Sequence, residues 1–188
     1  MTDTARTEQS KLPHWLYEKI ERKVVDLYIE LGIQEIPVDP FEIIRKRGYI
    51  AMPFSKIKDI DFLKFANGSN DAFSFFNPER NTYIIVYDDK KPLSRLRFTL
   101  MHEIGHIDLG HKSESNLARK MADCYASYAL APSPLIGLFT SGNKDEIQNE
   151  FGVSNECAEV CQKRYYKWSV YGGAKYKDYE QTLLDLIM

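Results

Sequence analysis

The residues best suited to chemistry are two histidines and a glutamate close together in the sequence, His102, Glu103 and His106. If this stretch is helical, the two imidazoles lie one turn apart on the same face, with Cβ atoms about 5–6 Å apart. At that separation two ring nitrogens can reach one Zn²⁺ at about 2.0–2.1 Å each. The carboxylate of Glu103 lies beside them, where it can deprotonate a water molecule that the metal activates. The spacing therefore predicts a hydrolytic zinc site with Glu103 as its catalytic base.

The apolar residues around the motif favour a helix. Leu100, Ile104 and Ile107 recur at the spacing of a stripe that faces the core. Both histidines fall on the opposite side of such a helix. Gly110 predicts its end, because glycine readily adopts the left-handed conformation that terminates helices. The predicted ligands therefore lie in the last turns of the helix.

Further elements are needed to position this helix. Apolar residues at helical spacing predict a helix from Pro13 to Leu31, and Asp39-Pro40 predicts the start of a short one. Aromatic and β-branched runs predict strands at 49–54, 72–76 and 82–87, the last two forming a hairpin. Further helices are predicted at 115–131, 135–139, 145–151, 154–168 and 176–187.

Four segments, in this order and spacing, resemble the ImmA/IrrE family of zincin-like metallo-endopeptidases. They are Ile36–Pro40, the hairpin of Ala72–Phe75 and Tyr83–Val86, Arg97–His106, and Met121–Pro132. The resemblance covers nearly the whole chain. It implies an α+β zincin-like fold, in which a small sheet of about three strands packs on the metal helix. It also implies a cytoplasmic zinc endopeptidase, often carried by mobile genetic elements, that cleaves a helix-turn-helix repressor.

The third zinc ligand is where the chain departs from the family. The resemblance places a glutamate at position 119, four residues before Asp123, but this chain has Arg119 there and Met121 two positions later. Asp123 lies one turn along the same helix face, and we take it as the candidate third ligand. It could instead hold a metal-binding histidine by a hydrogen bond. Glu114 and His111 are the alternative ligands.

Arg119 also supports a second hypothesis, that of a catalytically weakened or silent relative that binds a protein partner without cutting it. A fixed guanidinium near the metal repels Zn²⁺ and can pair with Glu103 or Asp123. Zn²⁺ is thus the expected cofactor, and its occupancy separates the two hypotheses.

The composition limits the other functions. A length of 188 residues suits one domain, and 44% hydrophobic residues are enough for a core. A net charge of −2 gives no general attraction to nucleic acid or to a membrane, so neither is an expected partner. Three cysteines and a polar start without a signal peptide predict reduced thiols in the cytoplasm. We expect a flexible tail at 1–12, a zincin-like domain at 13–134 and a helical segment packed on it at 135–188.

Two patterns near the carboxyl end suggest other chemistry. Residues 145–158 resemble a helix-turn-helix unit, but residues 144–168 contain four basic and five acidic side chains. Binding to phosphates requires a basic surface, which argues against DNA. Cys157 and Cys161 are expected to be small buried apolar residues and not a metal pair.

Overall fold

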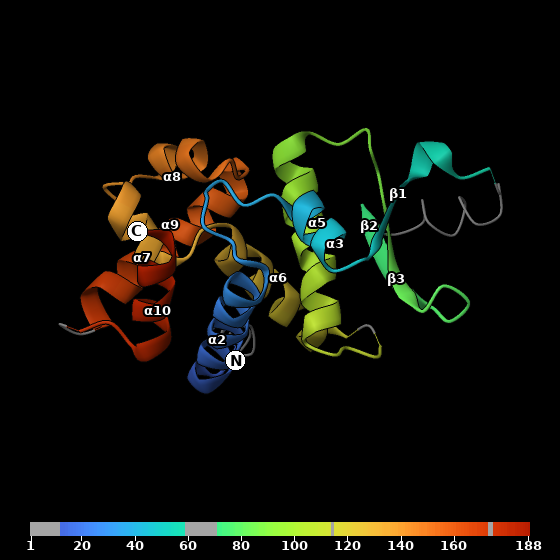
Figure 1. Cartoon of the computed structure of the whole chain (residues 1–188). Coiled ribbons are helices and arrows are strands. Elements are labelled where there is room, and N and C mark those ends of the chain that lie inside the picture. Colours follow the sequence, from blue (N-terminus) through green and yellow to red (C-terminus); the bar gives the residue numbers. More distant parts are fainter. Residues whose placement is uncertain (1–11, 59–70, 114, 173–174) are drawn as a thin grey trace, which may run out of the picture.

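The structure, a computed structural model, describes residues 12–58, 71–113, 115–172 and 175–188. The sheet lies at one end of the molecule and the carboxyl-terminal helices at the other, with α5 and α6 between them (Figure 1). This arrangement confirms the predicted α+β class with a small three-stranded sheet. The strands are β1 (Ile50–Pro53), β2 (Ala72–Asn77) and β3 (Thr82–Tyr87). The helices are α2 (His14–Leu31), α3 (Pro40–Lys46), α5 (Leu93–Asp108), α6 (Asn116–Leu130), α7 (Ser133–Phe139), α8 (Lys144–Phe151), α9 (Asn155–Tyr171) and α10 (Asp178–Ile187), and a 3₁₀ turn η1 spans Phe54–Lys56.

The sheet has the order β1-β3-β2, in which β1 runs parallel to β3 and β2 runs antiparallel to it. The two antiparallel strands form the predicted hairpin. Asn77 closes its turn by accepting a hydrogen bond from the backbone N–H of Arg80 at 2.9 Å. Asn81 has a φ of 49°, in the left-handed region that asparagine tolerates better than most residues. In the order β1-β3-β2, β2 forms one edge of the sheet among the described strands.

Helix α5, which carries His102, Glu103 and His106, packs between the sheet and α6. Its apolar stripe is buried as predicted, with Leu100 and Ile104 fully inaccessible. Gly110 has a φ of 68° and ends the helix, and the backbone N–H of His111 returns to the carbonyl of His106 at 3.0 Å. This termination folds the chain back against the last turn of α5 and thereby keeps His111 next to His106.

Helices α5 and α6 form a close hairpin. The side chain of Ser115 caps α6 by accepting a hydrogen bond from the backbone N–H of Ala118 at 3.0 Å. Gly105 allows the close approach, because a Cβ atom at this position would lie 3.0–3.1 Å from side-chain atoms of Tyr125. The two helices run antiparallel, so one face of α6 lies opposite the histidines of α5.

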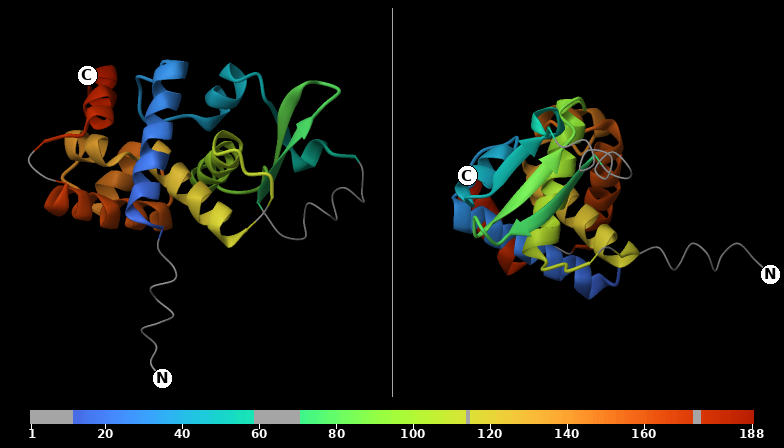
Figure 2. Two further views of the ribbon diagram at one scale, coloured as in Figure 1. Left: turned by 90° about the horizontal axis from the view of Figure 1, so that it is seen from below. Right: turned by 90° about the vertical axis from the view of Figure 1, so that its right-hand side faces the viewer.

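The carboxyl-terminal helices share one core with α2 and α6 (Figure 2). Tyr179 on α10 donates a hydrogen bond to Glu21 on α2 at 2.7 Å, and Arg164 on α9 binds the end of α6. Leu12, which the predicted boundary assigned to a flexible tail, is buried against this core. The rest of that tail lies outside the described residues. None of the described helices combines the length and apolar character needed to cross a bilayer.

Candidate metal centre

The two histidines of the motif are brought together as the sequence predicts. Their Nε2 atoms lie 3.0 Å apart, and the rings are 4.7 Å apart between centroids. Two zinc–nitrogen bonds of about 2.0–2.1 Å at a tetrahedral angle would place such atoms about 3.3 Å apart. His106 is buried and His102 is partly accessible. The pair therefore has the separation of two ligands that share one ion.

Asp123 lies behind His102, on the other side of its ring from His106. Its Oδ1 atom is 2.8 Å from Nδ1 of His102. A carboxylate that contacts Nδ1 fixes the orientation of the ring and leaves Nε2 for the metal. In this arrangement Asp123 contacts the ring of His102 on the side away from the two Nε2 atoms. This is the geometry of the second role considered for Asp123, a hydrogen-bond partner that holds a metal-binding histidine.

His111 has the corresponding place behind His106. Their Nδ1 atoms are 3.0 Å apart, and the rings meet edge to face at 4.9 Å. Each histidine of the motif is thus held at Nδ1 by a partner from outside the motif. The contact follows from the helix end at Gly110, which returns His111 to α5. The sequence offered His111 only as an alternative ligand, and the structure places it as the neighbour of one.

The contact between the two Nε2 atoms requires a proton or a cation between them. In a neutral His102 ring, the proton donated to Asp123 is on Nδ1, which leaves a lone pair on Nε2. The Nε2 atom of His106 is 3.0 Å from Nε2 of His102, which carries that lone pair. Two lone pairs at this distance repel, so either a proton on His106 or a cation must lie between them. A metal ion can take the place of that proton while both contacts at Nδ1 are kept.

Glu103 lies beside the histidines and is buried, with 8% of its surface exposed. Its Oε2 atom accepts a hydrogen bond of 2.7 Å from the hydroxyl of Ser74 on β2. Sequence reasoning missed Ser74 as a site residue. The available signal was a small polar side chain in the aromatic run Phe73-Ser74-Phe75-Phe76, at the position that alternation directs toward α5.

The third ligand is the part of the site that the described residues do not provide. Among them no group of three histidine, cysteine, aspartate or glutamate side chains is arranged to hold a metal ion. Arg119 is exposed on α6, one turn before Asp123, and the antiparallel helices bring its position level with His106. Glu114, an alternative ligand, lies outside the described residues. His102 and His106 therefore fit two of the ligand positions of a zinc ion, and the third ligand position is not filled by the described residues.

The three cysteines do not add to this site. All are free thiols and buried, and the Sγ atoms of Cys157 and Cys161 are 3.9 Å apart. Burial raises the pKa of the Cys124 thiol to about 12, so that thiol stays protonated at neutral pH. Cys157 and Cys161 lie in the core, as their expected apolar role requires.

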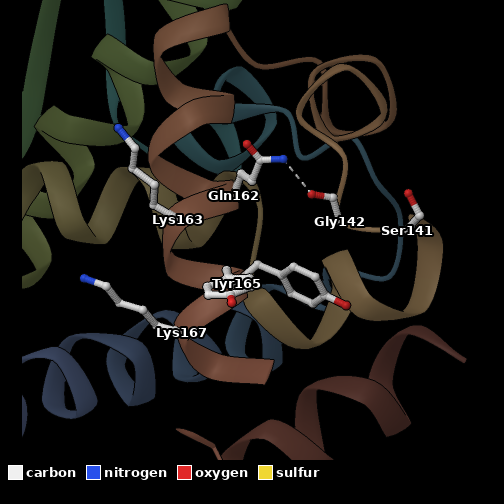
Figure 3. Close-up of a pocket in the computed structure, with 7 residues that line it drawn as sticks. Ser141, Gly142, Gln162, Lys163, Tyr165 and Lys167 are labelled. Atoms are coloured by element: carbon white, nitrogen blue, oxygen red, sulfur yellow. Dashed lines mark hydrogen bonds between the residues drawn. The ribbon is translucent and has the colours of Figure 1, made fainter. Parts of the chain in front are cut away.

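A separate open pocket of about 440 Å³ lies on the outer side of α9. Gln162 donates its amide to the carbonyl of Gly142 at 3.0 Å, and the ring of Tyr165 fills the space beside that glycine (Figure 3). Lys163 and Lys167 extend along the helix away from Gly142 (Figure 3). The lining contains no histidine or carboxylate. This pocket therefore has none of the groups that the hydrolytic chemistry requires.

Comparison with known proteins gives a family and no individual relative. Residues 58–160, more than half of the chain, match the family model Peptidase_M78, described as the IrrE N-terminal-like domain. The matched range contains β2, β3, α5 and α6, and so includes His102, Glu103, His106 and Asp123. No curated protein gives a significant match.

Proposed function

Because the chain belongs to the Peptidase_M78 family of IrrE N-terminal-like domains, we propose that it is a zinc-dependent metallo-endopeptidase. The family supports a metallopeptidase type of function. The observation that carries the proposal is the pair of Nε2 atoms of His102 and His106 at 3.0 Å, with the buried carboxylate of Glu103 beside them. These are two of the ligands, and the base, that peptide hydrolysis by a zincin requires.

In the proposed reaction His102 and His106 would hold the zinc ion, and Asp123 and His111 keep their rings in place through contacts at Nδ1. Bound zinc supplies Lewis acidity that activates water and polarises the peptide carbonyl. Glu103 takes a proton from the attacking water and later gives it to the leaving amine.

We further propose that the substrate is a helix-turn-helix repressor protein in the cytoplasm. The resemblance to the ImmA/IrrE family implies this substrate class, and three free thiols suit a reducing compartment. An extended segment of the repressor can pair with the outer edge of β2, where none of the described strands lies, and β2 carries Ser74 beside Glu103. Neither nucleic acid nor a membrane is needed as a partner.

The first test is the zinc content per chain, measured by elemental analysis of protein purified without chelator or added metal. We expect a stoichiometry near one, and a loss of zinc in the double variant His102→Ala/His106→Ala. Glu103→Gln should keep the zinc and lose cleavage of a repressor encoded beside this gene. A value near zero in the wild-type protein would contradict the zinc-dependent activity.

Arg119 favours a second candidate function, that of a family member which binds its protein partner without cutting it. The arginine occupies the position where the resemblance expects a carboxylate ligand, and the described residues supply no third donor. The two candidates differ in zinc content and in turnover. A chain without zinc that still binds the intact repressor in a pull-down, with unchanged binding by the Glu103→Gln variant, would support the second one.

A further inference from the structure

We propose that Ser74 is a positioning residue that holds the catalytic carboxylate of Glu103 and links its orientation to the edge strand β2. This inference rests on the proposed function, because it requires Glu103 to be the base. Ser74 donates a hydrogen bond of 2.7 Å to Oε2 of Glu103. A bond to one oxygen restricts rotation of the carboxylate.

The position of Ser74 in the sheet explains how it reaches Glu103. Ser74 is paired in register with Ile85, a fully buried residue of the core that α5 also joins. Paired residues of antiparallel strands project from the same face, so Ser74 faces α5. Its neighbours Phe73 and Phe75 project from the other face and stack at 6.2 Å.

The chemistry of the two groups requires a contact of this kind. A buried carboxylate must be compensated by hydrogen-bond donors, and the hydroxyl of a partly buried serine needs an acceptor. The serine side chain is short enough to let β2 approach α5 closely. The contact between Ser74 and Glu103 therefore gives the hydroxyl its acceptor and Oε2 a donor, and at the same time fixes the strand relative to the base.

The location of Ser74 gives the contact a role in the reaction beyond stability. Strand β2 pairs with β3 on one side, and none of the described strands pairs with its other edge. A peptide that adds to this edge would lie on the same strand that holds Glu103. Pairing of the substrate with β2 then sets the distance between the scissile bond and the base.

The test compares Ser74→Ala with the conservative variant Ser74→Thr. We use Thr82→Val as a matched control, because Thr82 lies in the same sheet but donates its hydroxyl to the carbonyl of Gly48. On a repressor that the wild-type protein cleaves, Ser74→Ala should lower kcat about 10- to 100-fold, the loss of one hydrogen bond to a charged group. KM should change less than about 3-fold, a split that marks an interaction needed in the transition state.

Two further measurements separate positioning from folding. Ser74→Ala should bind as much zinc per chain as the wild-type protein, and Ser74→Thr should recover most of kcat. Unchanged kcat in Ser74→Ala, or an equal loss in Thr82→Val, would overturn the proposal. So would a loss in Ser74→Ala that Ser74→Thr does not repair.

A structural readout keeps the inference testable if the proposed peptidase activity fails. High-resolution crystal structures of the wild-type protein and Ser74→Ala should show one orientation of the Glu103 carboxylate in the first and several in the second. A single, unchanged orientation in Ser74→Ala would overturn the positioning role by itself. Absence of zinc or turnover in the wild-type protein would instead count against the proposed function.

Discussion

At the scale of single residues, both histidines of the motif have a partner at Nδ1. His102 and His106 are each held at Nδ1, by Asp123 and His111 at 2.8 and 3.0 Å. Such partners orient a metal-binding ring and raise its basicity. The departure from the pattern that the resemblance implies lies on α6, where Arg119 stands at the expected ligand position. We therefore expect the residue at this position to set the zinc affinity.

Substitution of Arg119 tests this conclusion. In Arg119→Glu a carboxylate replaces a cation at the position level with His106, so zinc affinity should rise by about 10-fold or more. The measurement is a competition titration with a chromogenic zinc chelator.

The control for this variant is Lys120→Glu, which makes the same change of charge at the neighbouring position of α6. Its zinc affinity should stay within about 2- to 3-fold of the wild-type value, because Lys120 is partly accessible and charges in contact with solvent are screened. Equal affinities for Arg119→Glu and the wild-type protein would show that position 119 does not reach the metal.

At the scale of secondary-structure elements, the close hairpin of α5 and α6 sets the geometry of the site. The contact of Gly105 with Tyr125 lets α6 approach near enough for Asp123 to reach His102. Tyr125 is fully buried, and its hydroxyl donates a hydrogen bond to Asp108 at 2.5 Å. Core packing holds the ring of Tyr125, and the hydrogen bond to Asp108 holds its hydroxyl. The side chain therefore has little room to move away from a methyl group added at Gly105.

The substitution Gly105→Ala should therefore destabilise the protein. Alanine improves helix propensity by about 1 kcal/mol, but overpacking a core contact costs about 1–3 kcal/mol. We expect a lower Tm, by about 2–4 °C for each kcal/mol lost, in a calorimetric scan. In a Tyr125→Ala background, where the added methyl group meets no ring, Gly105→Ala should stabilise the protein. A higher Tm for the single variant would contradict the steric argument.

The start of β2 is tied to α5 by charge. Asp71 is paired with Arg95 on α5 and with Lys91. Partial burial acts to raise the pKa of Asp71, but the hydrogen bonds from Arg95 and Lys91 outweigh it and hold the pKa below its ordinary value of 3.8. A carboxyl whose pKa is lowered by folding stabilises the protein above its unfolded-state pKa. That stabilisation is lost as the pH falls through the folded-state pKa.

The substitution Asp71→Asn should thus cost stability only when the carboxyl is ionised. We expect its free energy of unfolding in urea to lie about 0.2–1 kcal/mol below that of the wild-type protein near neutral pH, as for a partly exposed ion pair. The difference should shrink to zero at pH values below the folded-state pKa. A difference that stays the same at acidic and neutral pH would assign the effect to packing.

At the scale of the whole molecule, the carboxyl-terminal helices support the end of α6. Arg164 on α9 donates hydrogen bonds to the carbonyls of Ser127 and Ala131, among the last groups of α6, and to the hydroxyl of Ser127 at 2.9 Å. The final carbonyls of a helix have no partner within it, so these bonds supply what the helix end needs. Helix α6 is thereby fixed at one end by α9, while its other end lies near the metal site.

Loss of this support should be measurable as global stability. Arg164→Met should lower the free energy of unfolding by about 1–3 kcal/mol, because acceptors at the end of α6 lose their donor. The adjacent Lys163→Met is the matched control, since Lys163 is exposed and pairs only with Glu159 among the described ion pairs. Its effect should stay within about 0.5 kcal/mol. Equal midpoints for both variants in urea unfolding would show that Arg164 does not support α6.

The sequence by itself determined the local features of the protein. Hydrophobic spacing and terminating glycines defined α2 and α5, and the left-handed conformations of Gly32 and Gly110 agree with the predicted ends. The aromatic and β-branched runs predicted the hairpin of β2 and β3. The spacing of His102 and His106 predicted a shared face, because residues one helical turn apart are always neighbours.

Tertiary structure decided the contacts between residues far apart in the chain. The sequence allowed Asp123 to be a ligand or a partner of a ligand, and the packing of α6 on α5 placed it at Nδ1 of His102. Ser74 is 29 positions from Glu103, and only the packing of the sheet on α5 brings the two together. Local spacing fixes geometry within one helix, whereas the side chains that complete a site depend on how separate elements pack.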